Sequence, residues 1–208
     1  MWRVDPRAAR DNVPRQMRFW GERLPFLREF ARDHRVLHMG PGREEAYGIT
    51  IDNLRSVKPS VLADLNRTPY PFRDDTFDAV YAFSVIEHLE NFFGVFGELW
   101  RILKPGGRVV LLTPHFSNDG SYIDPSHRLH LSLRSFDYFI EGTDLFASYG
   151  FYSRTRFRVA ERLLMLEPPW NHVPLLQRAV NRASAIYERH LCFLIRGRGI
   201  YLELEAVK

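Results

Sequence analysis

The chain has 208 residues, the length of one ordinary domain, and its 45% hydrophobic and 26% charged residues exclude a disordered or fibrous protein. Residues 1–10 lack the apolar core of a secretory signal, no apolar run is long enough to span a bilayer, and the lone Cys192 excludes an internal disulfide, so we expect a cytoplasmic protein. The net charge of +4 comes from arginines concentrated in residues 1–34 and 154–198, and because no zinc-finger spacing or RNA-binding aromatic motif accompanies them, we expect no nucleic-acid partner.

The first half of the chain alternates short apolar runs with turns. An arginine-rich segment over residues 6–34 predicts one or two short helices, and Asp5-Pro6 is a suitable helix start. The apolar runs that follow end on glycine, acidic or polar residues, as buried strands do. Strands are predicted over residues 35–39, 47–51, 60–63 and 77–83.

The second half begins with a strongly periodic helix. Apolar residues recur every three or four positions from Val85 to Leu103, and Lys104 with the turn Pro105-Gly106-Gly107 is expected to end that helix. A β-branched run over residues 108–113 predicts a strand buried on both faces. After a polar loop, the patterns predict helices over residues 133–148 and 174–195 and strands over residues 155–166 and 199–207.

Strands thus alternate with helices, which predicts an α/β protein with a parallel sheet. Ligands of such sheets bind outside the carboxyl ends of the strands. Three features fall at such ends: the turn Gly40-Pro41-Gly42, the carboxylate of Asp52, and Asp64-Leu65. Glycines admit a ligand close to the backbone, and a carboxylate can accept two hydrogen bonds from a ribose. Each feature taken alone is equally consistent with a tight turn or a helix cap.

Three longer segments of the sequence help to decide between a cofactor site and simple turns or helix caps. They are Pro71–Val80 (PFRDDTFDAV), Val85–Leu89 (VIEHL) and Leu99–Arg108 (LWRILKPGGR). These segments resemble the PF-D-x-x-FD-x-V, V-x-EHL and R-x-LKPGG signatures of the methyltransferase type 11 group, which are class I S-adenosylmethionine-dependent enzymes. The resemblance covers about residues 35 to 140.

The resemblance implies a single Rossmann-like three-layer sandwich over residues 1–208, with a seven-stranded, mostly parallel sheet of order 3-2-1-4-5-7-6 and an antiparallel last strand. Residues 1–34 would be an N-terminal helical segment, 35–166 the cofactor-binding core, and 167–208 a C-terminal helix and final strand. The cofactor would be S-adenosyl-L-methionine. Its methionine part would face Gly40 and Gly42, its ribose Asp52, its adenine Asp64 and Leu65, and the floor of its site would be Ser84 and Val85.

Two departures from the group keep an alternative open. His38 stands where the group usually has an acidic residue, and about ten residues separate Gly42 from Asp52, too few for the usual crossover helix. Both favour a non-catalytic, methyltransferase-like binding protein as the alternative to an active enzyme. A nicotinamide-dependent oxidoreductase is disfavoured because the turn after Gly42 lacks the third glycine of G-x-G-x-x-G. A nucleic-acid methyltransferase is disfavoured because no N-P-P-Y motif or Pro-Cys turn is present.

The loop over residues 113–130 follows the fifth strand, beside the expected methyl group. Methyl transfer to an oxygen or a protonated amine needs a base, and neutral histidine serves near pH 7. We predict His115 or His127 as the base, oriented by Asp124, with His88 as the next candidate. The same side chains, with Tyr122 and His130, would alternatively tie the loop together by hydrogen bonds. A metal site from His115, Asp124, His127 and His130 matches no zinc spacing, so no metal is predicted.

The predicted helix over residues 174–195 carries Arg178, Arg182 and Arg189 beside an apolar stripe. It is expected to cover the sheet and the substrate pocket, with peripheral contact to an anionic membrane as the alternative. The sequence therefore predicts methyl transfer to a small-molecule, sugar or lipid-linked acceptor and leaves the oligomeric state open.

Overall fold

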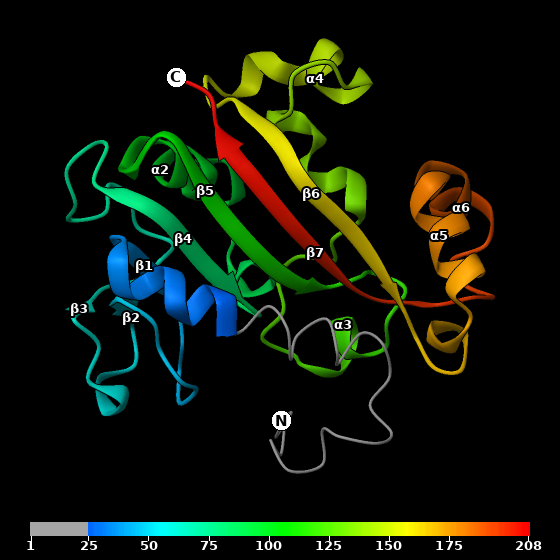
Figure 1. Ribbon diagram of the computed structural model, residues 1–208, viewed down its shortest axis with the longest axis horizontal. Coiled ribbons are helices and arrows are strands. Elements are labelled where there is room, and N and C mark those ends of the chain that lie inside the picture. Colours follow the sequence, from blue (N-terminus) through cyan, green and yellow to red (C-terminus); the bar gives the residue numbers. More distant parts are fainter. Residues whose placement is uncertain (1–24) are drawn as a thin grey trace.

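The computed structural model describes residues 25–208, which form one seven-stranded sheet with the strand order β3-β2-β1-β4-β5-β7-β6 (Figure 1). Strands β1 to β5 pair in parallel, and β7 runs antiparallel to both β5 and β6. The predicted strand order and the antiparallel last strand are confirmed. The strands are β1 (Val36–Met39), β2 (Ile49–Asp52), β3 (Val61–Leu62), β4 (Phe77–Phe83), β5 (Leu103–Pro114), β6 (Phe157–Leu166) and β7 (Gly197–Ala206).

Helices lie on both sides of this sheet. Helix α2 lies behind β4 and β5 in Figure 1, and the helix over residues 25–33 crosses in front of the sheet. The predicted helix start at Asp5-Pro6 lies outside the described residues. The α-helices are α2 (Phe92–Ile102), α3 (Gly120–Ile123), α4 (Asp144–Tyr149), α5 (Pro174–Arg182) and α6 (Ser184–His190), and the 3-10 turns are Arg55–Val57, Ile86–His88, Leu133–Phe139, Gly150–Tyr152 and Trp170–His172. Among the described helices, none is both long and apolar enough to cross a membrane.

Successive side chains of each strand point to opposite faces of the sheet, so the buried residues form two separate cores. In β1, Leu37 and Met39 join the large cluster packed by α2, α5 and α6, whereas Val36 belongs to the cluster on the opposite face. The second cluster is smaller and is covered by Leu27 and its neighbours in the helix over residues 25–33. Burial on both faces explains why the central strands are continuous apolar runs in the sequence.

The crossover between β1 and β2 contains no helix, as its length predicts. The space beneath it is filled by His38, whose ring stacks on Tyr47 and meets Tyr81 and Phe83 edge-on. His38 is 3% exposed, and burial lowers the pKa of its imidazole to about 4. The residue is therefore neutral near pH 7, with Nδ1 accepting a hydrogen bond from the Tyr47 amide at 3.3 Å.

Three predicted helices have different limits in the structure. The helix predicted from Val85 begins only at Phe92, because the side chain of Asn91 accepts a hydrogen bond from the Gly94 amide and caps the helix there. The helix predicted over residues 133–148 is a 3-10 turn followed by α4, since Gly142 between them has a φ of +85°. The helix predicted over residues 174–195 is divided into α5 and α6 at Ala183, whose φ of −122° and ψ of 40° are not helical.

Several strand limits also differ from those predicted, and two of the differences have a clear local cause. Strand β2 starts at Ile49 rather than residue 47, because Gly48 has a φ of +68°. Strand β5 starts at Leu103 rather than Arg108, since Leu103 pairs with Phe77 before a bulge interrupts the ladder. The turn Pro105-Gly106-Gly107 thus lies within β5 and does not simply end the preceding helix.

Candidate functional site

The glycine turn at the end of β1 is shaped by contact with the neighbouring strand end. Gly40 and Gly42 have φ values of +54° and +57°, a region that side chains rarely adopt. A Cβ on Gly40 would also lie 2.6 Å from Cγ2 of Val85, whereas one on Gly42 would meet nothing within 4 Å. The turn is therefore packed against Val85 at Gly40 and open at Gly42, where a ligand can approach the backbone.

Asp52 ends β2 and faces this turn. Its Oδ2 accepts a hydrogen bond from the Gly42 amide at 3.0 Å, and its Oδ1 accepts one from the Leu54 amide at 2.8 Å. The residue is 6% exposed. Since a carboxylate oxygen can accept two hydrogen bonds, both oxygens retain capacity for the hydroxyls of a ribose while holding the turn in place.

The remaining predicted cofactor residues lie at the ends of β3 and β4. Asp64 Oδ1 accepts a hydrogen bond from the Asn66 amide at 3.0 Å, and Leu65 is buried beside it. Ser84 follows β4 with a φ of +52°, and Val85 is buried next to Gly40. Because β3, β2, β1 and β4 are adjacent in that order, the predicted cofactor residues share one edge of the sheet.

A second group of side chains lies beside Val85. Glu87 and His88 come from the 3-10 turn after β4, and His127 comes from the loop after β5. One potential ligand atom from each of the three lies within 4.8 Å of the others, and the rings of His88 and His127 meet edge-on with their centroids 4.6 Å apart. The structure thus brings together two of the three histidines that were predicted as candidate bases.

Backbone hydrogen bonds fix this arrangement. The carbonyl of Glu87 accepts hydrogen bonds from the amides of Arg128 at 2.7 Å and Leu129 at 3.0 Å, which holds the loop against the 3-10 turn. The Glu87 side chain is 1% exposed, and its Oε2 accepts a hydrogen bond from the Thr113 hydroxyl at 3.0 Å. Sequence reasoning missed Glu87, although its place in the VIEHL segment was the available signal.

The environment of His127 differs in one respect from the prediction. Nδ1 lies 3.1 Å from the Ser121 carbonyl, whereas Asp124 Oδ2 lies 4.0 Å from Nε2. A carbonyl only accepts, so Nδ1 carries the proton and Nε2 presents a lone pair. The Ser121 carbonyl therefore orients the ring, and the Asp124 carboxylate lies near Nε2. Hydrogen bonds from Ser126 lower the pKa of the Asp124 carboxyl, which keeps it ionised.

His115 lies in a different environment. It is fully buried, with Nδ1 2.8 Å from the Ser117 hydroxyl and Nε2 3.2 Å from Glu188 Oε1 in α6. Both ring nitrogens thus have protein partners. His130 forms a third arrangement, in which its Nδ1 lies 2.9 Å from Ser121 Oγ and its ring stacks on Tyr122.

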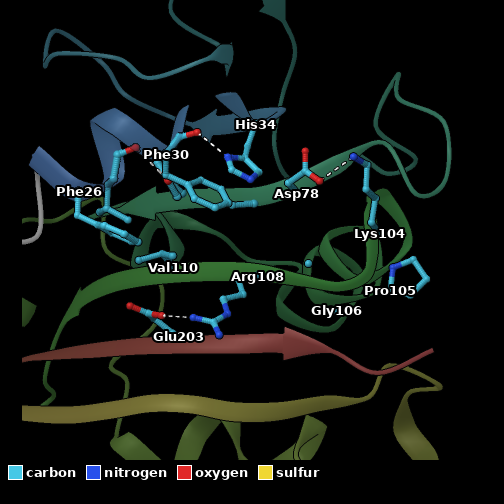
Figure 2. Close-up of a pocket in the computed structure, with 14 residues that line it drawn as sticks. Phe26, Phe30, His34, Asp78, Lys104, Pro105, Gly106, Arg108, Val110 and Glu203 are labelled. Carbon is cyan, nitrogen blue, oxygen red and sulfur yellow. Dashed lines mark hydrogen bonds and ion pairs between the residues drawn. The ribbon is translucent and has the colours of Figure 1, made fainter. Parts of the chain in front are cut away.

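A hollow of about 410 Å³ lies between Phe116 and α6, next to His115. A groove of about 460 Å³ lies on the opposite face of the sheet, between the helix over residues 25–33 and the start of β5 (Figure 2). Lys104 and Asp78 form an ion pair of 2.7 Å along the groove. Because Asp78 lies at the start of β4, this groove is at the edge of the sheet opposite to the cofactor residues.

Comparison with known proteins supports the predicted family. Residues 45–111, about a third of the chain, match a family model described as a methyltransferase domain. This match agrees with the resemblance to class I S-adenosylmethionine-dependent methyltransferases that the sequence signatures carry. The structure of an S-adenosylmethionine-dependent methyltransferase from Archaeoglobus fulgidus superimposes over 93% of this chain and 95% of its own, with a TM-score of 0.58 and 15% identity, which shows the shared fold.

Two curated relatives are named as methyltransferases of a sterol and of demethylmenaquinone. Sterol 24-C-methyltransferase of Schizosaccharomyces pombe is 43% identical over 58 residues, which is 28% of this chain and 15% of that protein. Demethylmenaquinone methyltransferase of Tropheryma whipplei is 36% identical over 61 residues, which is 29% of this chain and 25% of that protein. The aligned segments therefore span a quarter or less of these relatives.

The family match and the shared fold support S-adenosylmethionine as the cofactor. The residues present fit it: the glycine turn is open at Gly42, and Asp52 retains hydrogen-bonding capacity at the neighbouring strand end. The glycine turn and the acidic strand end lie on one side of Val85, and the cluster of Glu87, His88 and His127 follows Val85 on the other.

Proposed function

We propose that this protein transfers a methyl group from S-adenosylmethionine to a small-molecule, sugar or lipid-linked acceptor. The observation that carries the proposal is the placement of two sets of residues at one sheet edge: Gly40, Gly42 and Asp52 on one side of Val85, and His127 with its neighbours on the other. An acceptor at the second set would meet the cofactor held by the first.

His127 is our candidate for the proton acceptor. S-adenosylmethionine, held by the glycine turn and Asp52, would supply a methyl group on a positively charged sulfur for transfer to an oxygen or nitrogen of the acceptor. The proton that the acceptor loses passes to Nε2 of His127, whose Nδ1–H is held by the Ser121 carbonyl. Asp124, 4.0 Å from Nε2, then stabilises the imidazolium. His115 is less suited to this step because both of its nitrogens already have partners.

Calorimetric titration with S-adenosylmethionine, with NAD as the control ligand, tests the cofactor half of the proposal. We expect micromolar binding of S-adenosylmethionine and none of NAD, because the turn lacks the third glycine of a dinucleotide site. In the same preparation, labelled methyl groups should pass into a product when a metabolite and lipid extract is supplied. Cofactor binding without any transfer would favour the non-catalytic alternative, and a folded protein that binds no cofactor would contradict the proposal.

A protein that acts on a lipid-linked acceptor must contact a membrane surface, and the exposed surface of α5 and α6 is our candidate for that contact. Both helices lie at the end of the molecule beyond β6 (Figure 1). Leu175, Phe193 and Leu194 in and after these helices are each at least 75% exposed, and Arg178 and Arg189 are exposed nearby. Exposed apolar side chains among arginines are typical of segments that bind anionic lipid surfaces.

We expect the protein to sediment with vesicles that contain phosphatidylglycerol but only weakly with vesicles of phosphatidylcholine. A Phe193→Ser, Leu194→Ser double variant should lose most of this binding, because burial of the two side chains contributes roughly 1.5–3 kcal/mol each. The matched control is Phe151→Ser, which removes an equally exposed aromatic side chain near α4. Equal binding of the double variant and the control would exclude this surface.

A further inference from the structure

Glu87, His88 and His127 converge on the acceptor side of the proposed site. They are not among the residues proposed to bind the cofactor. Glu87 and His88 belong to the 3-10 turn after β4, and His127 to the loop after β5. Each offers one ligand atom within 4.8 Å of the other two. We propose that these three side chains bind a divalent transition-metal ion.

The first argument is the state of Glu87. Its Oε2 is satisfied by the Thr113 hydroxyl at 3.0 Å, but its Oε1 is buried and has no hydrogen-bond partner. Leaving a buried carboxylate oxygen without a partner is costly, and such atoms in folded proteins commonly mark an ion or a water. A cation between Glu87 and the two imidazoles would satisfy this oxygen.

The second argument is the protonation of the two rings. His127 donates Nδ1–H to the Ser121 carbonyl at 3.1 Å, so its Nε2 is unprotonated. The Ser126 hydroxyl donates to Asp124 at 2.6 Å, and it therefore accepts from His88 Nδ1 at 3.0 Å. His88 Nε2 is then also unprotonated. A histidine that donates one ring N–H to a protein oxygen and presents the other nitrogen is the usual form of a metal ligand.

The donor set indicates which ion fits. Two imidazole nitrogens and one carboxylate oxygen suit Zn²⁺, Fe²⁺ and similar divalent ions, rather than Ca²⁺ or Mg²⁺, which prefer oxygen ligands. Bonds of about 2.0–2.2 Å to one ion would bring the ligand atoms closer together than the 4.8 Å within which they now lie. Three protein ligands leave at least one position open for water or for an acceptor oxygen.

An ion at this position would act as a Lewis acid beside the transferred methyl group. A hydroxyl bound to a divalent ion has a lowered pKa and becomes a better nucleophile. Because the ion would occupy Nε2 of His127, it would replace that nitrogen as the group that activates the acceptor, and the proton of the acceptor would pass to solvent water. Metal binding itself depends only on the three side chains and can be measured without any acceptor.

The experiment is a titration of chelator-treated full-length protein with Co²⁺, followed by visible absorption, and with Zn²⁺ in competition with a chromophoric chelator. We expect one equivalent of each ion to bind, with d–d bands from Co²⁺ in a site of low coordination number. Glu87→Gln and His127→Ala should each weaken Zn²⁺ binding at least tenfold. His130→Ala, on the same loop but stacked on Tyr122, should bind Zn²⁺ like the wild type.

Calorimetric binding of S-adenosylmethionine to each variant shows that it is folded and separates this test from that of methyl transfer. If Glu87→Gln does not fold, His88→Ala takes its place, because His88 is only partly buried. The proposal is overturned if folded wild-type protein binds no stoichiometric ion. It is also overturned if His127→Ala binds Zn²⁺ as tightly as the wild type, or if His130→Ala is weakened as much as His127→Ala.

Discussion

Replacing Asp52 with alanine is expected to weaken the binding of S-adenosylmethionine by at least about 100-fold. Hydrogen bonds to a charged group contribute roughly 1.5–3 kcal/mol each, and every 1.4 kcal/mol changes an affinity about tenfold. The variant would lose the bonds to the ribose and also the bond from the Gly42 amide to Oδ2, which holds the glycine turn. Calorimetric titration of the purified variant measures the change.

The control for this variant is Asp78→Ala. Asp78 also joins two elements, since its carboxylate accepts a hydrogen bond from the Arg35 amide at 2.8 Å and pairs with Lys104 at 2.7 Å. It lies at the start of β4, at the opposite edge of the sheet, so its loss should destabilise the fold without weakening cofactor binding. Unchanged affinity in a folded Asp52→Ala protein would show that this carboxylate does not hold the cofactor.

Strand positions were predictable because they depend on local patterns. The limits of β4 agree with the sequence prediction, since a continuous apolar run between turn residues leaves little choice for a strand buried on both faces. Helix starts were less predictable. Apolar spacing continues from Val85 through Leu89, yet the capping bond from the Gly94 amide to Asn91 places the first helical turn at Phe92. Periodicity alone does not show which of several polar residues caps a helix.

The candidate site was predictable only in part. The contacts in one half join residues that are close in sequence, whereas those in the other half join residues that are far apart. Gly40, Gly42 and Asp52 are close in sequence and end adjacent strands, so parallel pairing alone places them together. His127 is brought to Glu87 by contacts such as the hydrogen bonds from Arg128 and Leu129 to the Glu87 carbonyl, about forty positions earlier in the sequence. No local pattern in the sequence encodes that contact.

The separation of His115 from His127 has a similar cause. A Cβ on Gly197 would lie 2.7 Å from His115 Nδ1, so the ring occupies space left by a glycine at the start of β7. Its Nε2 meets Glu188 of α6. Both partners belong to the C-terminal part of the chain. His115 and His127 therefore have different surroundings in the fold, although they lie in the same loop. The His115 ring is buried and hydrogen-bonded at both nitrogens, so it is expected to contribute to stability. His127 remains available as the proposed proton acceptor.

Replacing His127 with alanine is expected to lower the rate of methyl transfer about 10²- to 10⁴-fold, the range that general base catalysis contributes, while the affinity for S-adenosylmethionine stays within about twofold of the wild type. The affinity is spared because the cofactor residues lie on the other side of Val85. The measurement is formation of labelled product from methyl-labelled S-adenosylmethionine, with a metabolite and lipid extract as the source of acceptor.

Two further variants serve as controls for the measurement on His127→Ala. His130→Ala, from the same loop, should keep most of the activity, because its ring stacks on Tyr122 and its Nδ1 bonds to Ser121 Oγ. His115→Ala should lower the melting temperature, since it removes a fully buried ring together with its hydrogen bonds to Glu188 and Ser117. If His127→Ala retained full turnover and His115→Ala lost it at unchanged stability, the base would be His115, and the assignment of His127 as the group that activates the acceptor would be wrong.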